Sequence, residues 1–185
     1  RRIVWHSGVY RVAIRPIVVV PHQALVEKAQ DIKNIDAGIR RLARDMADTM
    51  YHVPGLGLAA NQVGKLIRMI VLDIVYPYAE PSEKKRNPVF ILNPRISLQE
   101  GSCSREEGCL SVPEFGLEVK RADCVQVVGI DLDGNPITMD AEGLLARVLQ
   151  HEIDHLNGTT ILDHASALKR NLYRRRIKKK QRNDQ

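Results

Sequence analysis

The sequence has no long apolar run, few aromatic residues and only three cysteines. A bilayer-spanning helix needs roughly eighteen consecutive apolar residues, so short runs such as 17–20 and 69–72 predict a soluble protein with no membrane partner. Cys103, Cys109 and Cys124 form no C-x-x-C pair and cannot all be paired, which argues against a disulfide framework and favours a reducing compartment. The first sixteen residues also lack the apolar core of a secretory signal.

Acidic residues are missing from two basic segments, one near each end of the chain. The 28 basic and 22 acidic side chains give a net charge of +6, but residues 169–182 hold nine Lys or Arg and no acid, and residues 1–16 hold four Arg and no acid. The remainder, 17–168, has 15 basic and 21 acidic residues, or −6. This distribution argues against sequence-specific nucleic-acid binding across the fold and leaves the tail as the candidate contact. We therefore divide the chain into an N-terminal extension of unknown status (1–16), a main domain (17–168) and a basic tail (169–185).

Hydrophobic periodicity predicts the fold class. Apolar residues at helical spacing indicate an amphipathic helix over 36–52, and a second helix is expected over 141–157. Strands are predicted at 68–73, 89–92, 117–119, 125–131 and 137–139, with an exposed loop at 77–88. A helix, a run of antiparallel strands and a helix packed on them predict an α+β fold in one domain, with the strands around a central helix.

The strongest chemical signal lies in the second predicted helix, where residues 151–155 read His-Glu-Ile-Asp-His. Residues four apart share one helix face, so His151 and His155 can hold one metal ion, and Glu152 can reach a water on that ion. Two buried, hydrogen-bonded histidines with no metal are the simpler alternative.

The third ligand is not fixed by this motif. Ile161 occupies the place of the third histidine in one protease class, and Glu152 is the last glutamate in the chain, which excludes proteases with a downstream glutamate ligand. Asp163, His164 and the upstream Cys109 remain as donors. A thiolate beside two imidazoles would suit Fe(II), Zn, Co or Ni rather than Mg or Ca.

Two further segments accompany this helix. Residues 55–62 read Gly-Leu-Gly-Leu-Ala-Ala-Asn-Gln, and residues 107–111 read Glu-Gly-Cys-Leu-Ser. Alone, the first is a common tight loop and Cys109 a typical small buried residue. Together and in this order, the three segments resemble the motifs of the peptide deformylases, over most of 17–168. This resemblance implies a catalytic domain that hydrolyses the N-formyl group of newly synthesised polypeptides and releases formate.

The resemblance also implies a role for each matching residue. The implied metal ligands are Cys109, His151 and His155. Glu152 would move the proton, while the Gln62 side chain and the Leu110 backbone N–H would stabilise the oxyanion. Gly57 would let the substrate backbone approach closely. The expected cofactor is one divalent metal ion, Fe(II) first, with Zn, Ni or Co as substitutes.

The substrate methionine needs an apolar pocket. Leu56, Leu144 and Val148 are expected to form its walls, although plain core packing would explain them equally well. Two residues depart from the usual pattern: Asn61 stands where proline or a small residue is common, and Arg147 stands where many relatives are apolar.

Two other functions stay open. One is a metalloprotease using His151, His155 and Asp163, and the other is a non-enzymatic module with a structural metal and an RNA-binding tail. For the deformylase, the partners are N-formyl-methionyl nascent peptides and, through residues 169–182, the ribosome surface. Residues 168, 172, 173 and 177 would give that tail a narrow apolar stripe if it is helical. The expected location is the bacterial cytoplasm or an organelle with bacterial-type translation.

Overall fold

The computed structural model describes residues 13–183, so most of the predicted extension 1–16 lies outside the described residues. The α-helices are α1 (Ala37–His52), α2 (Gly143–Leu156) and α3 (Ala167–Asn183). The strands are β1 (Gly57–Ala59), β2 (Met69–Leu72), β3 (Val89–Glu100), β4 (Cys103–Cys109), β5 (Val112–Arg121), β6 (Cys124–Ile130) and β7 (Pro136–Glu142). Single 3₁₀ turns occur at Gln23–Leu25, Ala60–Val63, Tyr76–Tyr78 and Ile161–His164. In the described part of the chain, no helix is long and apolar enough to cross a membrane.

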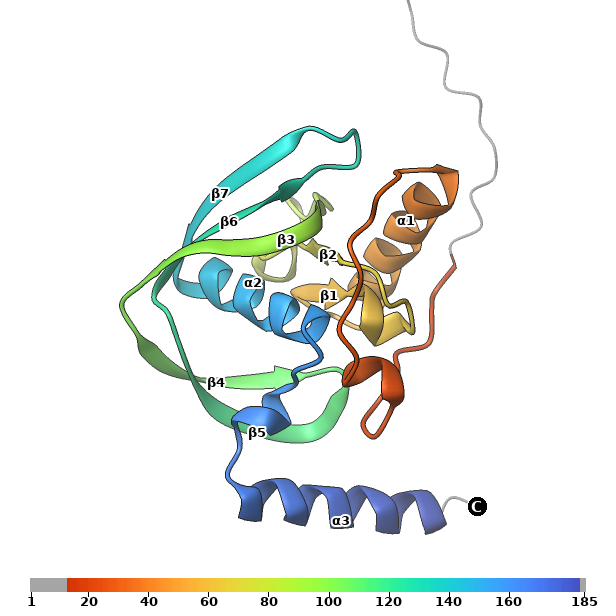
Figure 1. The fold of residues 1–185 in the computed structure, drawn as a ribbon, viewed down its shortest axis with the longest axis vertical. Helices are drawn as coiled ribbons and strands as arrows, with labels where there is room; N and C mark the ends of the chain where they lie inside the picture. Colours follow the sequence, from red (N-terminus) through yellow and green to blue (C-terminus); the bar gives the residue numbers. More distant parts are fainter. Residues whose placement is uncertain (1–12, 184–185) are drawn as a thin grey trace, which may run out of the picture.

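All strands pair antiparallel and form two sheets. The larger sheet has the order β1-β2-β3-β6-β7, and β4 and β5 form a separate two-stranded sheet. Figure 1 shows the chain turning from β3 into β4 and from β5 into β6, so that the two sheets curve around α2. The predicted α+β class, with strands around a central helix, is confirmed.

Helix α2 is central because it is apolar on more than one side. Leu149, Ile153 and Leu156 pack with Ile70 and Ile91 of the large sheet, and each of these five side chains is at most 4% exposed. Burial on this scale holds the helix at a fixed height above the sheet. Every side chain that projects from α2 toward β4 is therefore held on a rigid element.

Helix α1 covers β1 and β2 through a second core. Met46 and Met50 from its predicted inward stripe pack there with Leu58, Met69 and Val71, and all five are fully buried. The helix begins where predicted, because the Asp36 side chain accepts a hydrogen bond from the Ile39 N–H at 2.9 Å.

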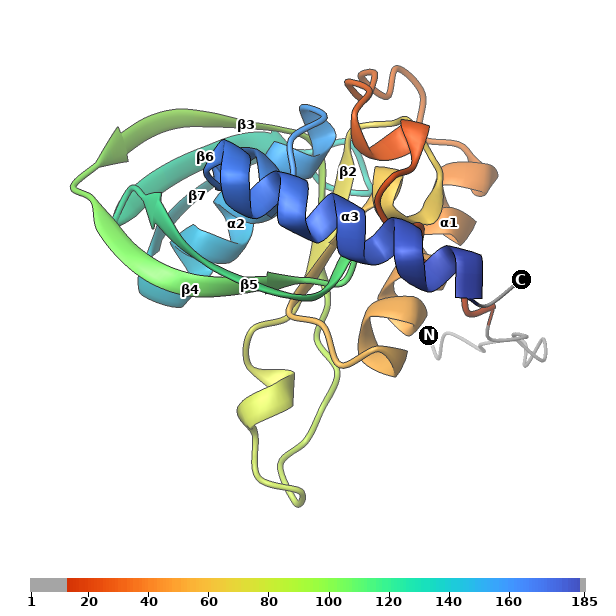
Figure 2. The ribbon, with the colours of Figure 1, turned by 90° about the horizontal axis from the view of Figure 1, so that it is seen from below.

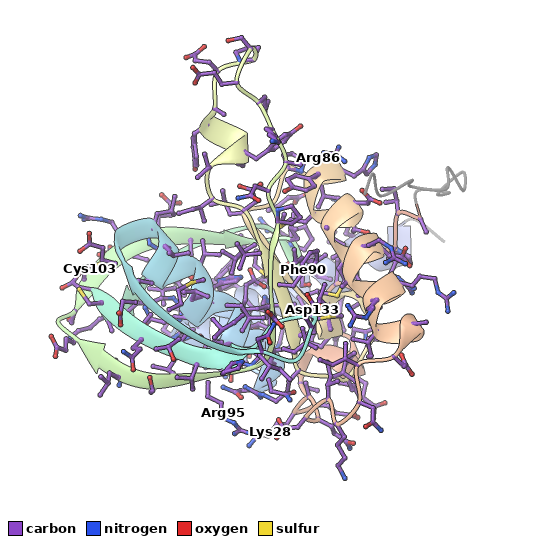
Figure 3. All side chains as sticks on the ribbon, turned by 90° about the horizontal axis from the view of Figure 1, so that it is seen from above. Lys28, Arg86, Phe90, Arg95, Cys103 and Asp133 are labelled. Atoms are coloured by element: carbon purple, nitrogen blue, oxygen red, sulfur yellow. The ribbon has the colours of Figure 1, made fainter. Side chains whose placement is uncertain are left out.

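The loop at 73–88 projects from the body, as Figures 2 and 3 show. Arg86, labelled in Figure 3 where the loop meets α1, stacks its guanidinium 4.7 Å from the ring centre of Tyr51. At the base of the loop, Asp73 accepts hydrogen bonds from the Tyr51 hydroxyl at 2.6 Å and from the Asn87 N–H at 2.9 Å. Asp73 thus ties both ends of the loop to α1.

Most of the basic tail is the helix α3, which lies across the β4–β5 hairpin (Figures 1 and 2). Tyr173 and Ile177 are buried against Val112 and the turn at Ile161–His164, whereas Leu168 and Leu172 are 69% and 56% exposed. The expectation of one apolar stripe through all four residues was therefore wrong. Only Tyr173 and Ile177 meet the body, because Leu168 and Leu172 lie on a side of the helix that faces solvent.

Candidate active site

Three metal-ligating atoms converge between α2 and β4. The Sγ atom of Cys109 lies 3.1 Å from Nε2 of His155, and this Nε2 lies 3.2 Å from Nε2 of His151. Among residues 13–183, these three side chains form the one group of His, Cys, Asp or Glu whose donor atoms all lie within 4.8 Å of one another. One sulfur and two imidazole nitrogens are a donor set that suits Fe(II), Zn, Co or Ni.

Asp163 and His164, the other donors considered for the third position, lie elsewhere. The Asp163 carboxylate accepts hydrogen bonds from the N–H of Thr160 at 2.8 Å and from its hydroxyl at 3.1 Å. The ring of His164 contacts the carboxylate of Asp154 at 3.1 Å. Both residues thus contribute to the turn that follows α2 and not to the group of three donors.

A buried network orients the first histidine. Nδ1 of His151 lies 3.0 Å from the Glu107 carboxylate, so its Nε2 is directed toward Cys109. Arg121 donates to both oxygens of Glu107, at 2.5 and 3.0 Å, and also to Asp154 at 2.8 Å. Burial alone would raise the pKa of Glu107, but the contacts with His151 and Arg121 outweigh it and lower the pKa to about 2.

Glu152 lies beside the donor group in a closed environment. Its side chain is only 4% exposed, and its Oε2 atom has no hydrogen-bond partner in the described structure. Burial raises its pKa to about 7. A buried carboxylate with a pKa near neutrality can take up and release a proton under ordinary conditions.

Gly57 is packed directly against this carboxylate. A Cβ atom at position 57 would lie 2.7 Å from Oε1 of Glu152, closer than atoms of this kind normally approach. The absence of a side chain at position 57 therefore makes room for Glu152. This is a second reason for glycine here, besides the predicted close approach of a substrate backbone.

Gln62 is held with its amino group toward the site. Its Oε1 atom accepts a hydrogen bond from the Ala59 N–H at 2.8 Å, so Nε2 points to Ser111 Oγ at 3.3 Å and Cys109 Sγ at 3.9 Å. The neighbouring Asn61 is buried and donates to the backbone oxygens of Ala24 and His155. The side chain that departs from the usual pattern thus links this loop directly to α2.

A cavity of about 660 Å³ opens beside the donor group. Its lining includes every residue predicted to move a proton, stabilise an oxyanion or bind substrate: Leu56, Gly57, Gln62, Leu110, Leu144, Val148 and Glu152. Arg147 also lines the cavity, as do residues 112–115 of β5. The segments that are far apart in the sequence therefore meet around one space.

The comparison with known proteins settles the family. The model of the polypeptide deformylase family matches residues 14–171. The chain belongs to this family. A peptide deformylase of Desulfosudis oleivorans is 48% identical over 165 residues, which cover 89% of this chain and 92% of that protein.

Solved deformylase structures share the fold. A Legionella pneumophila enzyme superposes with a TM-score of 0.83 at 42% identity, covering 93% of this chain and 98% of that one. An Acinetobacter baumannii deformylase, solved with Met-Ala-Ser bound, has a TM-score of 0.74 at 31% identity, covering 84% and 100%. The chain is a metal-dependent hydrolase that removes the N-formyl group from newly synthesised polypeptides.

Sequence reasoning assigned no role to Glu107 and Arg121, which hold His151 in place. Glu107 belongs to the Glu-Gly-Cys-Leu-Ser segment, but its contact with His151 depends on β4, a strand that the sequence pattern did not predict. No sequence spacing indicated Arg121, whose position depends on the pairing of β4 with β5.

Proposed function

We propose that Cys109, His151 and His155 hold the metal ion of this deformylase and that the adjoining cavity takes the formylated N-terminus. The observation that carries the proposal is the convergence of these three donors beside the buried carboxylate of Glu152. Three protein ligands leave a coordination position open, as in catalytic rather than structural sites. The donor set favours Fe(II), with Zn, Ni or Co as substitutes. The bound ion would supply a Lewis acid that activates water and polarises the formyl carbonyl.

Glu152 is the proton carrier in this proposal. Its carboxylate accepts a proton from the attacking water as the water oxygen bonds to the formyl carbon. When the C–N bond breaks, Glu152 returns that proton to the nitrogen, so that formate and a free α-amine leave. A pKa of about 7 suits both halves of this task, because the group must be ionised first and protonated afterwards.

Gln62 and Leu110 stabilise the negative charge that develops on the formyl oxygen. The Gln62 amino group is aimed at the site because its own carbonyl oxygen is fixed by Ala59. The backbone N–H of Leu110 follows Cys109 directly and lines the same cavity. Each such donor typically contributes about 3 kcal/mol to the transition state.

The methionine side chain of the substrate packs against the apolar wall formed by Leu56, Leu144 and Val148. Leu144 and Val148 lie on the same face of α2 as His151, and Leu56 lines the same cavity. The Met-Ala-Ser complex of the Acinetobacter baumannii relative supports a site that holds methionine and the residues that follow it. Gly57 lines the same space and offers its backbone to an extended peptide.

One assay tests this assignment against a protease that would use His151, His155 and Asp163. Formate release from a formyl-Met-Ala-Ser peptide should be lost in Cys109→Ser and Glu152→Gln, and reduced about a hundredfold or more in Gln62→Leu. Asp163→Asn should retain activity, because that carboxylate caps the turn at Thr160. Cleavage of internal peptide bonds, or full activity without Cys109, would overturn the assignment.

The protein should work where translation starts with formyl-methionine. Its expected location is therefore a bacterial cytoplasm or an organelle with bacterial-type translation.

We propose that the exposed basic face of α3 contacts the ribosome, whose surface is rich in phosphate. Arg175, Lys178, Lys179 and Arg182 gather on this face, and α3 carries no acidic residue.

A further inference from the structure

Residues 112–115 form one wall of the catalytic cavity, and they are also in contact with α3. The hydroxyl of Tyr173 donates to the backbone oxygen of Pro113 at 3.0 Å. The ring of Tyr173 meets the ring of Phe115 edge to face, with centroids 5.0 Å apart. One residue of the helix thus contacts two positions of this wall.

Glu114 has an unusual backbone conformation that α3 supports. Its φ angle is +57°, in the left-handed region that a residue other than glycine adopts only when its surroundings hold it there. Arg176 Nη2 donates to the Glu114 backbone oxygen at 2.6 Å, and Lys180 Nζ lies 2.6 Å from its carboxylate. Both contacts come from the helix, at positions one turn apart.

The reacting atoms are positioned by other elements. Cys109 comes from β4, both histidines and Glu152 come from α2, and Gln62 comes from the turn at Ala60–Val63. In the described structure, none of these side chains is hydrogen-bonded or ion-paired to α3, and only Cys109 packs against the apolar cluster that contains Tyr173 and Ile177. Arg176 and Lys180 contact Glu114 and none of the reactive side chains, so a change at these two positions should alter the cavity wall and leave the reacting groups in place.

We infer that α3 positions the wall at 112–115 and thereby sets the affinity for the peptide residues that follow the methionine. Tyr173, Arg176 and Lys180 are positioning residues, and Glu114 and Phe115 are the side chains they hold. This inference rests on the proposed use of the cavity by the formylated peptide. It gives the C-terminal helix a role in substrate binding that is independent of its exposed basic face.

Binding of the tripeptide Met-Ala-Ser to the metal-loaded full-length protein tests the inference directly. The double variant Arg176→Ala/Lys180→Ala should weaken binding about fivefold in calorimetry, since it removes two charged contacts of which the ion pair is solvent-exposed. Leu172→Ala, on the exposed side of the same helix, is the matched control and should bind like the parent. Arg176→Lys/Lys180→Arg should restore most of the affinity. Equal binding by the parent and the double alanine variant would overturn the inference.

Kinetics add a readout that a general loss of structure would not give. In the double variant, KM for formyl-Met-Ala-Ser should rise about fivefold with kcat unchanged, and KM for formyl-methionine amide should stay at the parent value. Raising the salt concentration should increase the tripeptide KM of the parent but not of the variant. Parallel changes for both substrates, or a fall in kcat, would contradict a positioning role. A parent that binds Met-Ala-Ser but releases no formate would contradict the proposed function and leave the binding test to decide this inference.

Discussion

At the scale of single residues, the site depends on groups that hold the reactive side chains as much as on those side chains themselves. Glu152 has its raised pKa because the protein excludes water around it, and Gly57 leaves the space that it occupies. His151 presents Nε2 to the centre because Glu107 holds its other nitrogen.

Gly57→Ala should lower kcat at least tenfold, because the new Cβ would displace the Glu152 carboxylate by a substantial part of an ångström. Metal content should be unchanged, since the atoms nearest the new Cβ belong to Glu152 and not to the three donors. The measurement is formate release together with metal analysis of the same sample. Parental kcat in this variant would show that the Glu152 carboxylate does not need its present position.

Glu107→Gln should weaken metal binding by about 10- to 100-fold, because the variant loses the carboxylate that orients His151 and raises its basicity. Competition with a chelator measures the affinity. Glu118→Gln, an exposed change on the neighbouring strand β5, serves as the control. Equal metal affinity in both variants would contradict this role.

At the scale of elements, the sequence predicted the helices and strands that follow from a local hydrophobic pattern. It missed the strand segments that form only because another strand pairs with them. Both helices of the main domain and the β6–β7 hairpin lie close to their predicted bounds. β4 was missed because Cys-Ser-Arg-Glu-Glu-Gly-Cys has few apolar residues, and its partner is β5 rather than the large sheet. β3 runs on to Glu100 although its second half is exposed, because β6 pairs with it there.

The loop at 73–88 should make the stability of the fold depend on pH through Asp73. Burial raises the pKa of Asp73, but the hydrogen bonds from Tyr51, Tyr76, Asn87 and Val75 outweigh it and lower the pKa below its ordinary value. The ionised form therefore stabilises the fold at pH values above the unfolded pKa of about 3.9, and this contribution is lost as the pH falls through the folded pKa.

Tyr51→Phe should lower the free energy of unfolding by about 1 to 2 kcal/mol at pH 7, because it removes the hydroxyl that donates to Asp73 at 2.6 Å. The difference from the parent should shrink as the pH falls from 5 to 2, where the carboxylate becomes protonated. Denaturant unfolding at several pH values measures it. Tyr78→Phe, on an exposed ring of the same loop, should have no effect, and a difference independent of pH would contradict the assignment to Asp73.

At the scale of the whole molecule, the net charge of +6 describes neither the main domain nor the tail. Residues 17–168 carry −6 while α3 carries only basic charges among its ionisable groups. The structure divides those charges further. Arg176 and Lys180 contact the cavity wall at Glu114, whereas Arg175, Lys178, Lys179 and Arg182 gather on another part of the helix. Removal of the whole tail would therefore combine two effects, the loss of the basic charges and the loss of the contacts that the buried Tyr173 and Ile177 make with the body.

Neutralising the exposed face alone is the sharper test of ribosome contact. The variant with alanine at Arg175, Lys178, Lys179 and Arg182 should co-sediment with ribosomes much less than the parent at low salt, because each phosphate contact contributes through counterion release. Alanine favours the helix, so α3 should be retained. Alanine at Lys28, Lys33, Lys65 and Lys120, all exposed on the body, changes the net charge equally and should leave co-sedimentation nearly intact. Equal losses in the two variants would mean that overall charge, and not α3, governs the association.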